Sequence, residues 1–385
     1  MRSLGVLCLL FVSCGLEVDA GHATQRQGLT QVTGFGSNPG NLSLFVHAPA
    51  NLGTDVPLVV ALHGCSQDAN DYEAVGWNAL ADAHGFLVAY PQTTGNNGCF
   101  DWFDSSEQSR TGPQVTSLLQ MVQHLRATRG VDASRVYVTG LSAGGAMVNV
   151  LLAVAPDVFT RGQVLAGIPF GCASGVTSGY GCMVSSSSKT PAQWGALVDP
   201  VNADFPPPRI QLWHGTSDFT VTSTNLQEQV DQWTHVNGID VMADDTQTLG
   251  VATRRRFNDA NGVTRVEAWS LAGTGHGAPV DPMNGCGSNR LYMLDVDLCS
   301  AKEGARFFGL LEPVVVDAGV TQEDAGVDAG TVDPDAGATL PDAGAPAPVD
   351  AGTRPSEGGA AVPQGCATTP VLVPLALLAW RRRRG

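Results

Sequence analysis

A serine between two glycines carries the clearest chemical signal in the sequence. The pentapeptide Gly140–Gly144 follows a β-branched run at Val136–Thr139 and precedes an Ala-, Val- and Leu-rich stretch. A Gly-x-Ser-x-Gly segment between a strand and a helix is a nucleophile elbow, a tight turn that raises the serine hydroxyl above the sheet. We therefore expect Ser142 to be a catalytic nucleophile, with the helix N-terminus behind it favouring a developing oxyanion.

A serine hydroxyl is a weak nucleophile, so it needs a base that a carboxylate orients. The carboxylate is expected on a loop after a later strand. Ile210–Trp213 has the composition of such a strand, and Asp218 lies on the loop that follows. Asp199 and Asp204 follow no predicted strand, and Asp199 precedes a proline in a predicted turn. Asp218 is therefore the expected acid.

Two of the eight histidines follow Asp218 in the chain, namely His235 and His276. His235 ends a helical stretch, where a solvated or packing role is usual. His276 lies in the flexible loop Gly273–Gly277 after a predicted strand and is the expected base. His214 is expected to hold the acid loop through hydrogen bonds. The remaining histidines precede the acid: His22, His47, His63, His84 and His124.

A tetrahedral intermediate also needs two backbone N–H donors. The residue after the nucleophile, Ala143, supplies one, and the loop after an early strand supplies the other. Leu58–Leu62 predicts that strand, and the next loop makes Cys65 the expected second donor.

Six cysteines lie in the central part of the chain, an even number that is typical of disulfides in an exported protein. Pairing of sequence neighbours favours Cys172–Cys182 and Cys286–Cys299, which leaves Cys65–Cys99 as the third bridge. Other connectivities of the six cysteines remain open. No Cys-x-x-Cys or His-x-x-x-His spacing occurs, so we expect no zinc site.

Two aromatic residues follow Cys99 closely. If Cys65 bonds to Cys99, that disulfide braces the oxyanion loop and holds Trp102 and Phe103 against the site. They would then form an aromatic wall for an acyl or polymer chain. The alternative is that both are ordinary core residues.

Residues 24–312 are expected to form one α/β domain. Its predicted strands alternate with helical stretches at Val115–Thr128 and Gly144–Val154, which predicts a mainly parallel sheet with helices on both faces. Val251–Phe257 and Val263–Leu271 flank an Asn-Gly-containing turn and predict an antiparallel pair or a strand pair at the sheet edge. The predicted strands before them are Leu42–Val46, Leu58–Leu62, Phe86–Tyr90, Val136–Thr139 and Ile210–Trp213.

The N-terminus, residues 1–23, has the pattern of a secretory signal. Its apolar stretch Leu4–Val12 is too short to span a bilayer, and a small-residue cleavage site follows at Val18–Ala20 or Gly21–Ala23. Two alternatives stay open. One is a lipoprotein signal cut before Cys14, although Phe11 stands where leucine is expected, and the other is a buried strand.

An acidic linker is predicted for residues 313–364. The triplet Asp-Ala-Gly occurs six times from Asp317 onward, and residues 313–365 contain nine acidic residues and one basic residue. Almost nothing in this segment can form a core, so we expect it to be disordered and extended. A calcium-binding repeat is the alternative, but it needs a tighter register of oxygen ligands.

The last segment, residues 365–385, combines Gly365-Cys366, an apolar run at Val371–Trp380 and four arginines. This tail resembles the MYXO-CTERM type of bacterial sorting signal. The resemblance implies processing near Cys366 by export and sorting machinery, with display on the cell surface or release. A weak membrane anchor is the alternative, because the apolar run is short for a membrane helix.

The net charge of −15 argues against nucleic-acid binding through phosphate contacts, since such binding needs clustered Lys and Arg. More than half of that excess lies in the predicted linker.

Taken together, the motifs resemble the poly(3-hydroxybutyrate) depolymerase family of esterases, which also contains acetylxylan and feruloyl esterases. The matching segments occur in the family's order across residues 30–310: Leu62–Gln67, Cys99–Phe103, Gly140–Met147, Trp213–Asp218 with Val221, and Gly273–His276. The resemblance implies a secreted Ser-His-Asp hydrolase of carboxylic esters without metal or organic cofactor. We expect it to be a monomer.

One departure from the family concerns the substrate. Secreted polyester depolymerases often have a polymer-binding domain after the catalytic domain, and here the predicted linker takes its place. A polyester such as poly(3-hydroxybutyrate) is the expected substrate, with acetylated or feruloylated plant polysaccharide as the alternative. Two further alternatives are a serine peptidase of the same fold and a non-enzymatic surface-binding module on a stalk.

Overall fold

The computed structural model describes residues 28–311 apart from positions 51, 186 and 203. The predicted signal at 1–23, the linker at 313–364 and the sorting segment at 365–385 lie outside the described residues. In the part that is described, no helix has the length and apolar character needed to cross a membrane.

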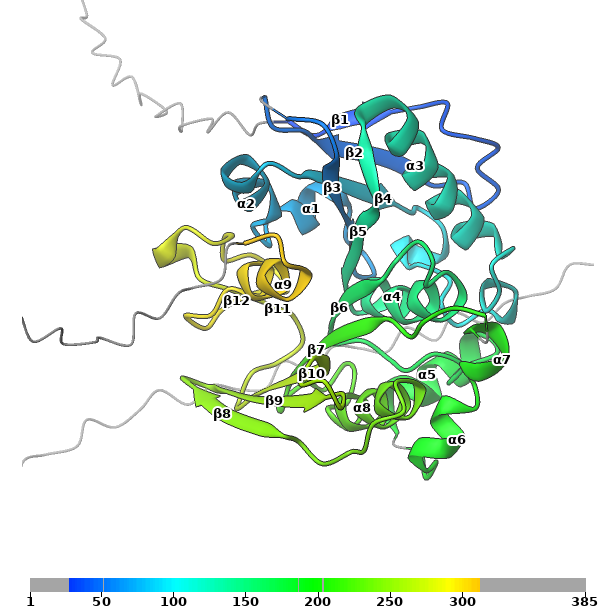
Figure 1. Ribbon diagram of the computed structural model, residues 1–385, viewed down its shortest axis with the longest axis vertical. Helices are drawn as coiled ribbons and strands as arrows, with labels where there is room; N and C mark the ends of the chain where they lie inside the picture. The colour runs from blue at the N-terminus through cyan, green and yellow to red at the C-terminus, as the bar shows by residue number, and fades with distance from the viewer. Residues whose placement is uncertain (1–27, 51, 186, 203, 312–385) are drawn as a thin grey trace, which may run out of the picture. The chain divides into compact units, whose positions relative to one another are not determined.

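A ten-stranded mixed sheet organises the described residues (Figure 1). The strand order is β1-β2-β4-β3-β5-β6-β7-β10-β9-β8, and the segment from β4 to β10 is parallel throughout. The strands are β1 (Thr30–Val32), β2 (Ser43–His47), β3 (Val56–Leu62), β4 (Leu87–Gln92), β5 (Val131–Leu141), β6 (Arg161–Leu165), β7 (Arg209–Gly215), β8 (Asp245–Leu249), β9 (Ala252–Asn258) and β10 (Thr264–Leu271). A separate parallel pair is formed by β11 (Ala278–Val280) and β12 (Met293–Asp295).

Helices cover both faces of this sheet, as Figure 1 shows for α3, α4 and α8 on one side and α2 and α9 on the other. The helices are α1 (Ala69–Glu73), α2 (Trp77–His84), α3 (Pro113–Arg129), α4 (Ala143–Val154), α5 (Val176–Val184), α6 (Pro191–Gly195), α7 (Asp199–Asn202), α8 (Thr224–Val236) and α9 (Ser300–Phe308). Short 3₁₀ turns occur at Asn96–Gly98, Ser105–Glu107 and Pro282–Asn284. The predicted α/β fold is therefore confirmed.

Two hydrophobic cores lie on the two faces. One contains Leu118 of α3, Leu151 of α4 and Trp233 of α8, and the other contains Trp77 of α2 and Phe308 of α9. Helix α4 is buried along all of its residues, which agrees with its almost wholly apolar sequence.

Five strands were not predicted from the sequence, namely β1, β6, β8, β11 and β12, and of these β6 lies at the centre of the sheet. Its sequence Arg-Gly-Gln-Val-Leu has no apolar alternation, yet β6 is central. Gln163 is fully buried and exchanges hydrogen bonds with Thr139 and Gln211 on the neighbouring strands, both at 2.8 Å. A polar ladder across the sheet thus replaces the apolar pattern that marks an ordinary buried strand.

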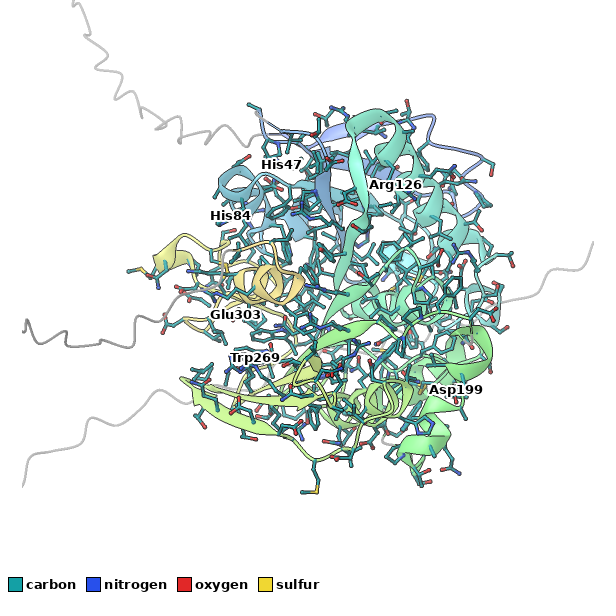
Figure 2. The ribbon with its side chains drawn as sticks, viewed as in Figure 1. His47, His84, Arg126, Asp199, Trp269 and Glu303 are labelled. Atoms are coloured by element: carbon teal, nitrogen blue, oxygen red, sulfur yellow. A yellow bond between two sulfur atoms is a disulfide. The ribbon has the colours of Figure 1, made fainter. Side chains whose placement is uncertain are left out.

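Two other expectations need adjustment. The predicted antiparallel pair forms as β9 and β10, but β10 also pairs with β7 in parallel, so the edge strand is β8. Asp199, labelled in Figure 2, begins the short helix α7 instead of lying in a simple turn. Its carboxylate lies 3.8 Å from His235 Nε2. Aspartate is favourable at a helix start because of the partial positive charge there.

Three disulfides close loops of the domain. They join Cys65 to Cys99, Cys172 to Cys182 and Cys286 to Cys299. Disulfides form in oxidising compartments, so these bridges indicate an exported location for the domain.

The Cys65–Cys99 bridge should contribute more to stability than Cys172–Cys182, because it closes 34 residues against 10. We expect Cys65→Ala/Cys99→Ala to lower the free energy of unfolding by about 3–4 kcal/mol, and Cys172→Ala/Cys182→Ala by about 2–3 kcal/mol. Urea unfolding monitored by tryptophan fluorescence measures both. The reverse ranking would contradict the loop-length argument.

Candidate active site

The turn at Ser142 has the strained backbone of a nucleophile elbow. Ser142 has φ 57° and ψ −117°, a region that costs a non-glycine residue about 1–3 kcal/mol. A Cβ on Gly140 would lie 2.5 Å from the Gly144 carbonyl, and one on Gly144 would lie 2.3 Å from the Leu62 carbonyl oxygen. Neither position can therefore carry a side chain in this turn, as the motif predicts.

The structure brings the expected acid and base into direct contact. His276 Nδ1 lies 2.6 Å from Asp218 Oδ2, and the Asp218 side chain is fully buried. The other carboxylate oxygen accepts the N–H groups of Thr220 and Val221, both at 2.9 Å. Since Nδ1–H donates to the carboxylate, the Nε2 atom of a neutral His276 is left as the proton acceptor.

His214 supports the same carboxylate from the strand side. Its Nε2–H donates to the Val221 carbonyl at 2.9 Å and lies 3.4 Å from Asp218 Oδ2. Burial raises the pKa of Asp218, but hydrogen bonds from His214 and His276 and the nearby imidazole charge outweigh it, so the pKa lies well below its ordinary value. Asp218 is therefore ionised throughout the neutral pH range.

Backbone hydrogen bonds align the loops that carry Ser142, Asp218 and His276. Ser142 N donates to Leu165 O at 2.9 Å, and Ala166 N donates to Trp213 O at 2.8 Å. Thr216 N then donates to Leu271 O at 2.9 Å. The three loops thus leave the carboxyl ends of β5, β7 and β10 at one edge of the sheet. Among the described residues, the hydrogen bonds include none from Ser142 Oγ to His276, and such contacts often tighten only with bound substrate.

A second loop approaches the elbow from the end of β3. An added Cβ on Gly64 would lie 3.4 Å from Ser142 Cβ, so this loop is in contact range of the nucleophile. Within residues 28–311, neither Cys65 N nor Ala143 N donates a hydrogen bond to a protein acceptor. Both groups are therefore available to an oxyanion, which is the arrangement expected for an oxyanion hole.

Buried His63 fixes this loop. Its Nδ1–H donates to Gly64 O at 2.8 Å, and its Nε2 accepts the Thr93 N–H at 3.2 Å. Burial lowers the pKa of His63, so the ring is neutral and can make both bonds. No role was predicted for His63 from the sequence, although its place two residues before the expected oxyanion donor Cys65 is a usable signal.

The aromatic residues after Cys99 are fixed by polar contacts as well as by the disulfide. Asp101 N donates to Gln114 Oε1 at 2.9 Å, and Gln114 Nε2 donates to Asp101 Oδ2 at 3.0 Å. The Glu107 carboxylate in turn accepts the backbone N–H groups of Gln114 and Val115, which caps the start of α3. The loop that carries Trp102 is thus held to α3.

An apolar cavity of about 360 Å³ lies beside the Cys65–Cys99 bridge. Trp102 and Phe103 line it, as do Val176, Tyr180 and Met183 from α5. Trp102 is only 7% exposed and belongs to the core, and it lines this cavity as well.

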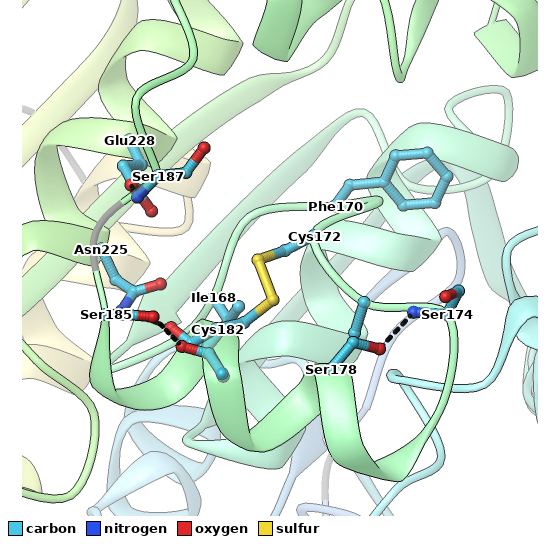
Figure 3. The surroundings of a disulfide bond; sticks show 12 residues. Ile168, Phe170, Cys172, Ser174, Ser178, Cys182, Ser185, Ser187, Asn225 and Glu228 are labelled. Carbon is cyan, nitrogen blue, oxygen red and sulfur yellow. Dashed lines mark hydrogen bonds between the residues drawn. A yellow bond between two sulfur atoms is a disulfide. The ribbon is translucent and has the colours of Figure 1, made fainter.

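Helix α5 presents an unusually apolar outer surface at this cavity. Val176, Tyr180 and Val184 are spaced four residues apart and are 57–64% exposed. The Cys172–Cys182 bridge holds the helix, as Figure 3 shows, and Asn225 Nδ2 donates to Cys182 O at 3.1 Å. This exposed apolar face of α5 was not predicted, although its four-residue spacing is visible in the sequence.

Tyr292 is a further neighbour of the expected base. Its ring meets that of His276 edge to face, with centroids 6.0 Å apart, and its backbone φ is 64°. It lies on the loop that the Cys286–Cys299 bridge closes. Nothing in the sequence pattern marked it. In the described ranges, no three His, Cys, Asp or Glu side chains are grouped so as to hold a metal ion.

Comparison with known proteins agrees with this geometry. The model of the family described as Esterase PHB depolymerase matches residues 41–256. The chain is 45% identical over 291 residues to poly(3-hydroxyalkanoate) depolymerase C of Paucimonas lemoignei, covering 74% of this chain and 70% of that protein.

The chain belongs to the PHB depolymerase family of esterases. It is therefore a carboxylic ester hydrolase.

Relatives with other names are more distant. Acetylxylan esterase of Coprinopsis cinerea is 36% identical, covering 65% of this chain and 69% of that protein. Feruloyl esterase B of Talaromyces stipitatus is 34% identical, covering 66% and 73%. The solved acetyl xylan esterase from Aspergillus awamori superimposes with a TM-score of 0.64 at 26% identity, covering 74% of this chain and all of that one.

The role of His63 in this esterase can be tested by stability. His63→Leu leaves the buried Thr93 N–H without a partner and removes one of the two donors to the Gly64 carbonyl, which still accepts from Gln67 N, so we expect the free energy of unfolding to fall by about 1–3 kcal/mol. His84→Leu is the matched control, because His84 is exposed in the last turn of α2 (Figure 2). This variant should change the free energy of unfolding by less than about 0.5 kcal/mol. Equal losses in the two variants would refute the role of His63.

Proposed function

We propose that this esterase hydrolyses polyhydroxyalkanoate through a Ser-His-Asp acyl-enzyme mechanism. In the first half, Ser142 Oγ attacks the ester carbonyl carbon while His276 Nε2 takes the hydroxyl proton. The Cys65 and Ala143 N–H groups donate hydrogen bonds to the oxyanion. The intermediate then collapses, the alkoxide leaves with the proton from His276, and an acyl group stays on Ser142.

In the second half, water attacks the acyl carbon and gives its proton to His276. Ser142 Oγ leaves and recovers that proton, which releases a carboxylic acid. Asp218 holds His276 through the 2.6 Å hydrogen bond and stabilises the imidazolium in both halves. The observation that carries this assignment is the contact of a buried, ionised Asp218 with His276 at the edge where the strained Ser142 turn ends β5.

The substrate class rests on similarity. The relative named for poly(3-hydroxyalkanoate) is 45% identical to this chain, against 34% and 36% for relatives named for feruloyl and acetylxylan esters. The apolar cavity supports the same choice, because a polyester chain offers alkyl groups and esters but few hydroxyl donors. Trp102 and Phe103 act as its inner wall, and Tyr180 of α5 as its outer wall.

The proposed location of the reaction rests on the predicted signal and sorting segments near the two ends of the sequence. We propose that residues 1–23 direct secretion, that 24–312 form the catalytic domain, and that 313–364 and 365–385 act as linker and sorting segment. The enzyme would then meet its polymer outside the cell, on the surface or after release. Treatment of whole cells with protease, followed by an assay of the remaining ester hydrolysis, tests this placement.

The mechanism predicts that Ser142→Ala loses at least about a thousandfold in ester hydrolysis, since the nucleophile is gone. We would quantify the soluble acids released from amorphous poly(3-hydroxybutyrate), acetylated xylan and feruloylated arabinoxylan. Comparing the wild type with Ser142→Ala tests the nucleophile, and comparing the three polymers tests the substrate class. We expect 3-hydroxybutyrate or its oligomers as the main products. Release of acetate or ferulate as the main product would instead identify plant-polysaccharide esters as the substrate.

Controls separate chemistry from folding in that experiment. A fluorophosphonate probe should label the wild type and not Ser142→Ala, while the unfolding midpoints of the two should agree. Retention of more than about a hundredth of the activity in Ser142→Ala would exclude Ser142 as the nucleophile.

The contribution of Tyr180, on the outer wall of the cavity, can be tested separately. Tyr180→Ala removes a 64% exposed ring, and we expect polymer hydrolysis to fall about fivefold while hydrolysis of soluble 4-nitrophenyl butyrate is unchanged. Met242→Ala is the matched control, because Met242 is 78% exposed and does not line the cavity. Equal effects of Tyr180→Ala on both substrates would show that the ring does not select the polymer.

A further inference from the structure

A second polar site lies at the amino ends of the parallel strands, whereas the candidate active site lies at their carboxyl ends. A cavity of about 290 Å³ there is lined by five arginines, whereas the chain as a whole has a net charge of −15. Two of these arginines begin adjacent strands: Arg161 starts β6, Arg209 starts β7, and their Cα atoms are direct partners in the sheet. Cross-strand partners in a parallel sheet point to the same face.

The arginine neighbours of this pair are already matched to carboxylates. Arg256 pairs with Glu267 at 2.9 Å, and Arg306 pairs with Glu303. Asp245 lies 3.8 Å from Arg256 and 3.9 Å from Arg254. Arg254 also has a buried Nε atom with no hydrogen-bond partner in the described residues.

Arg161 and Arg209 have no such match. Within the described residues, neither guanidinium lies within 4 Å of a carboxylate. Arg161 donates to the carbonyls of Phe307 and Phe308 at the end of α9, at 3.2 and 2.6 Å, and Arg209 donates through Nε to the Thr264 carbonyl at 2.7 Å. The helix terminus gives Arg161 only a partial negative charge.

These bonds also orient the two guanidinium groups. Arg209 lies over the Phe307 ring at 4.8 Å, and Arg161 lies over the Tyr137 ring at 5.8 Å. Burial lowers the pKa of Arg209 to about 10, and the charges of Arg161 and Arg265 add to this shift while Glu267 and Asp259 oppose it. Two fixed, like-charged forks beside a cavity form a costly arrangement unless an anion lies between them.

We propose that this cavity is a binding site for an oxyanion, held by Arg161 and Arg209. Arg256 and Arg306 lie at the same cavity, but their partners Glu267 and Glu303 line it too, so the unmatched positive charge is that of Arg161 and Arg209. The shared ligand chemistry is a carboxylate or phosphate group, because the planar guanidinium matches both through paired N–H donors. The volume accommodates a small organic acid as well as inorganic phosphate. The proposal is independent of the polymer substrate, since the site uses none of the groups at the carboxyl edge.

Isothermal titration calorimetry of the full-length chain with sodium phosphate or sodium 3-hydroxybutyrate tests the site, with ionic strength kept constant by sodium chloride. We expect one anion per chain to bind above the chloride background. Arg209→Gln should weaken this binding at least tenfold, and Arg161→Gln/Arg209→Gln should abolish it. The tighter of the two probes identifies the ligand as phosphate-like or carboxylate-like.

Arg126→Gln is the matched control, because Arg126 is exposed on α3, well separated in Figure 2 from Glu303 on α9. It should bind the anion within about twofold of the wild type. Hydrolysis of 4-nitrophenyl butyrate, unchanged in Arg209→Gln, verifies that the variant is folded. If that variant does not fold, Arg209→Lys replaces it, and loss of the fork should still weaken binding several-fold.

The proposal fails if neither anion binds above the chloride background. It also fails if the Arg209 variants bind phosphate and 3-hydroxybutyrate as tightly as Arg126→Gln does. Either result would leave the arginine pair with a purely structural role, as a clamp between α9 and the starts of β6 and β7.

Discussion

The close approach of the turn after β5 to the loop after β3 is the constraint on which the rest of the site depends. Gly144 lies so near the Leu62 and His63 carbonyls that no side chain fits between them. This contact sets the distance from the serine turn to the loop of Cys65, and hence the place where both N–H groups can meet one oxygen. The strain at Ser142 persists because buried α4 fixes the chain on the other side of the turn.

The supports of these two loops come from separate parts of the chain. His63 ties the first loop to the residue after β4, and the Cys65–Cys99 disulfide ties the same loop to the aromatic segment, which the Asp101–Gln114 pair holds to α3. Asp218 is held by its own loop backbone and by histidines on either side. Preorganisation of this kind matters because catalytic groups must hold their geometry before charge develops.

The sequence allowed the parallel strands and the expected nucleophile, acid and base to be placed, because each is marked locally by a strand followed by a loop. Strand β6 was missed because Gln163 makes it polar, and its stability comes from hydrogen bonds to strands far away in sequence. The wall formed by Tyr180 and the contact of Tyr292 with His276 arise only when distant segments pack together. The four-residue spacing of Val176, Tyr180 and Val184 indicates an apolar helix face, but a local pattern does not show which distant segment lies beside that face.

The parallel sheet also explains how an acid–base site and an arginine cluster can occupy one small domain. Strand β7 has Arg209 at its amino end and leads to Asp218 beyond its carboxyl end, and its seven residues span about 23 Å. That length exceeds the screening distance of about 8 Å at physiological ionic strength. The forces on the Asp218 carboxylate are accordingly local, from burial, His214 and His276, and no arginine is among the groups that shift its pKa. Because the strand separates the two edges, each can develop its own charge without disturbing the chemistry of the other.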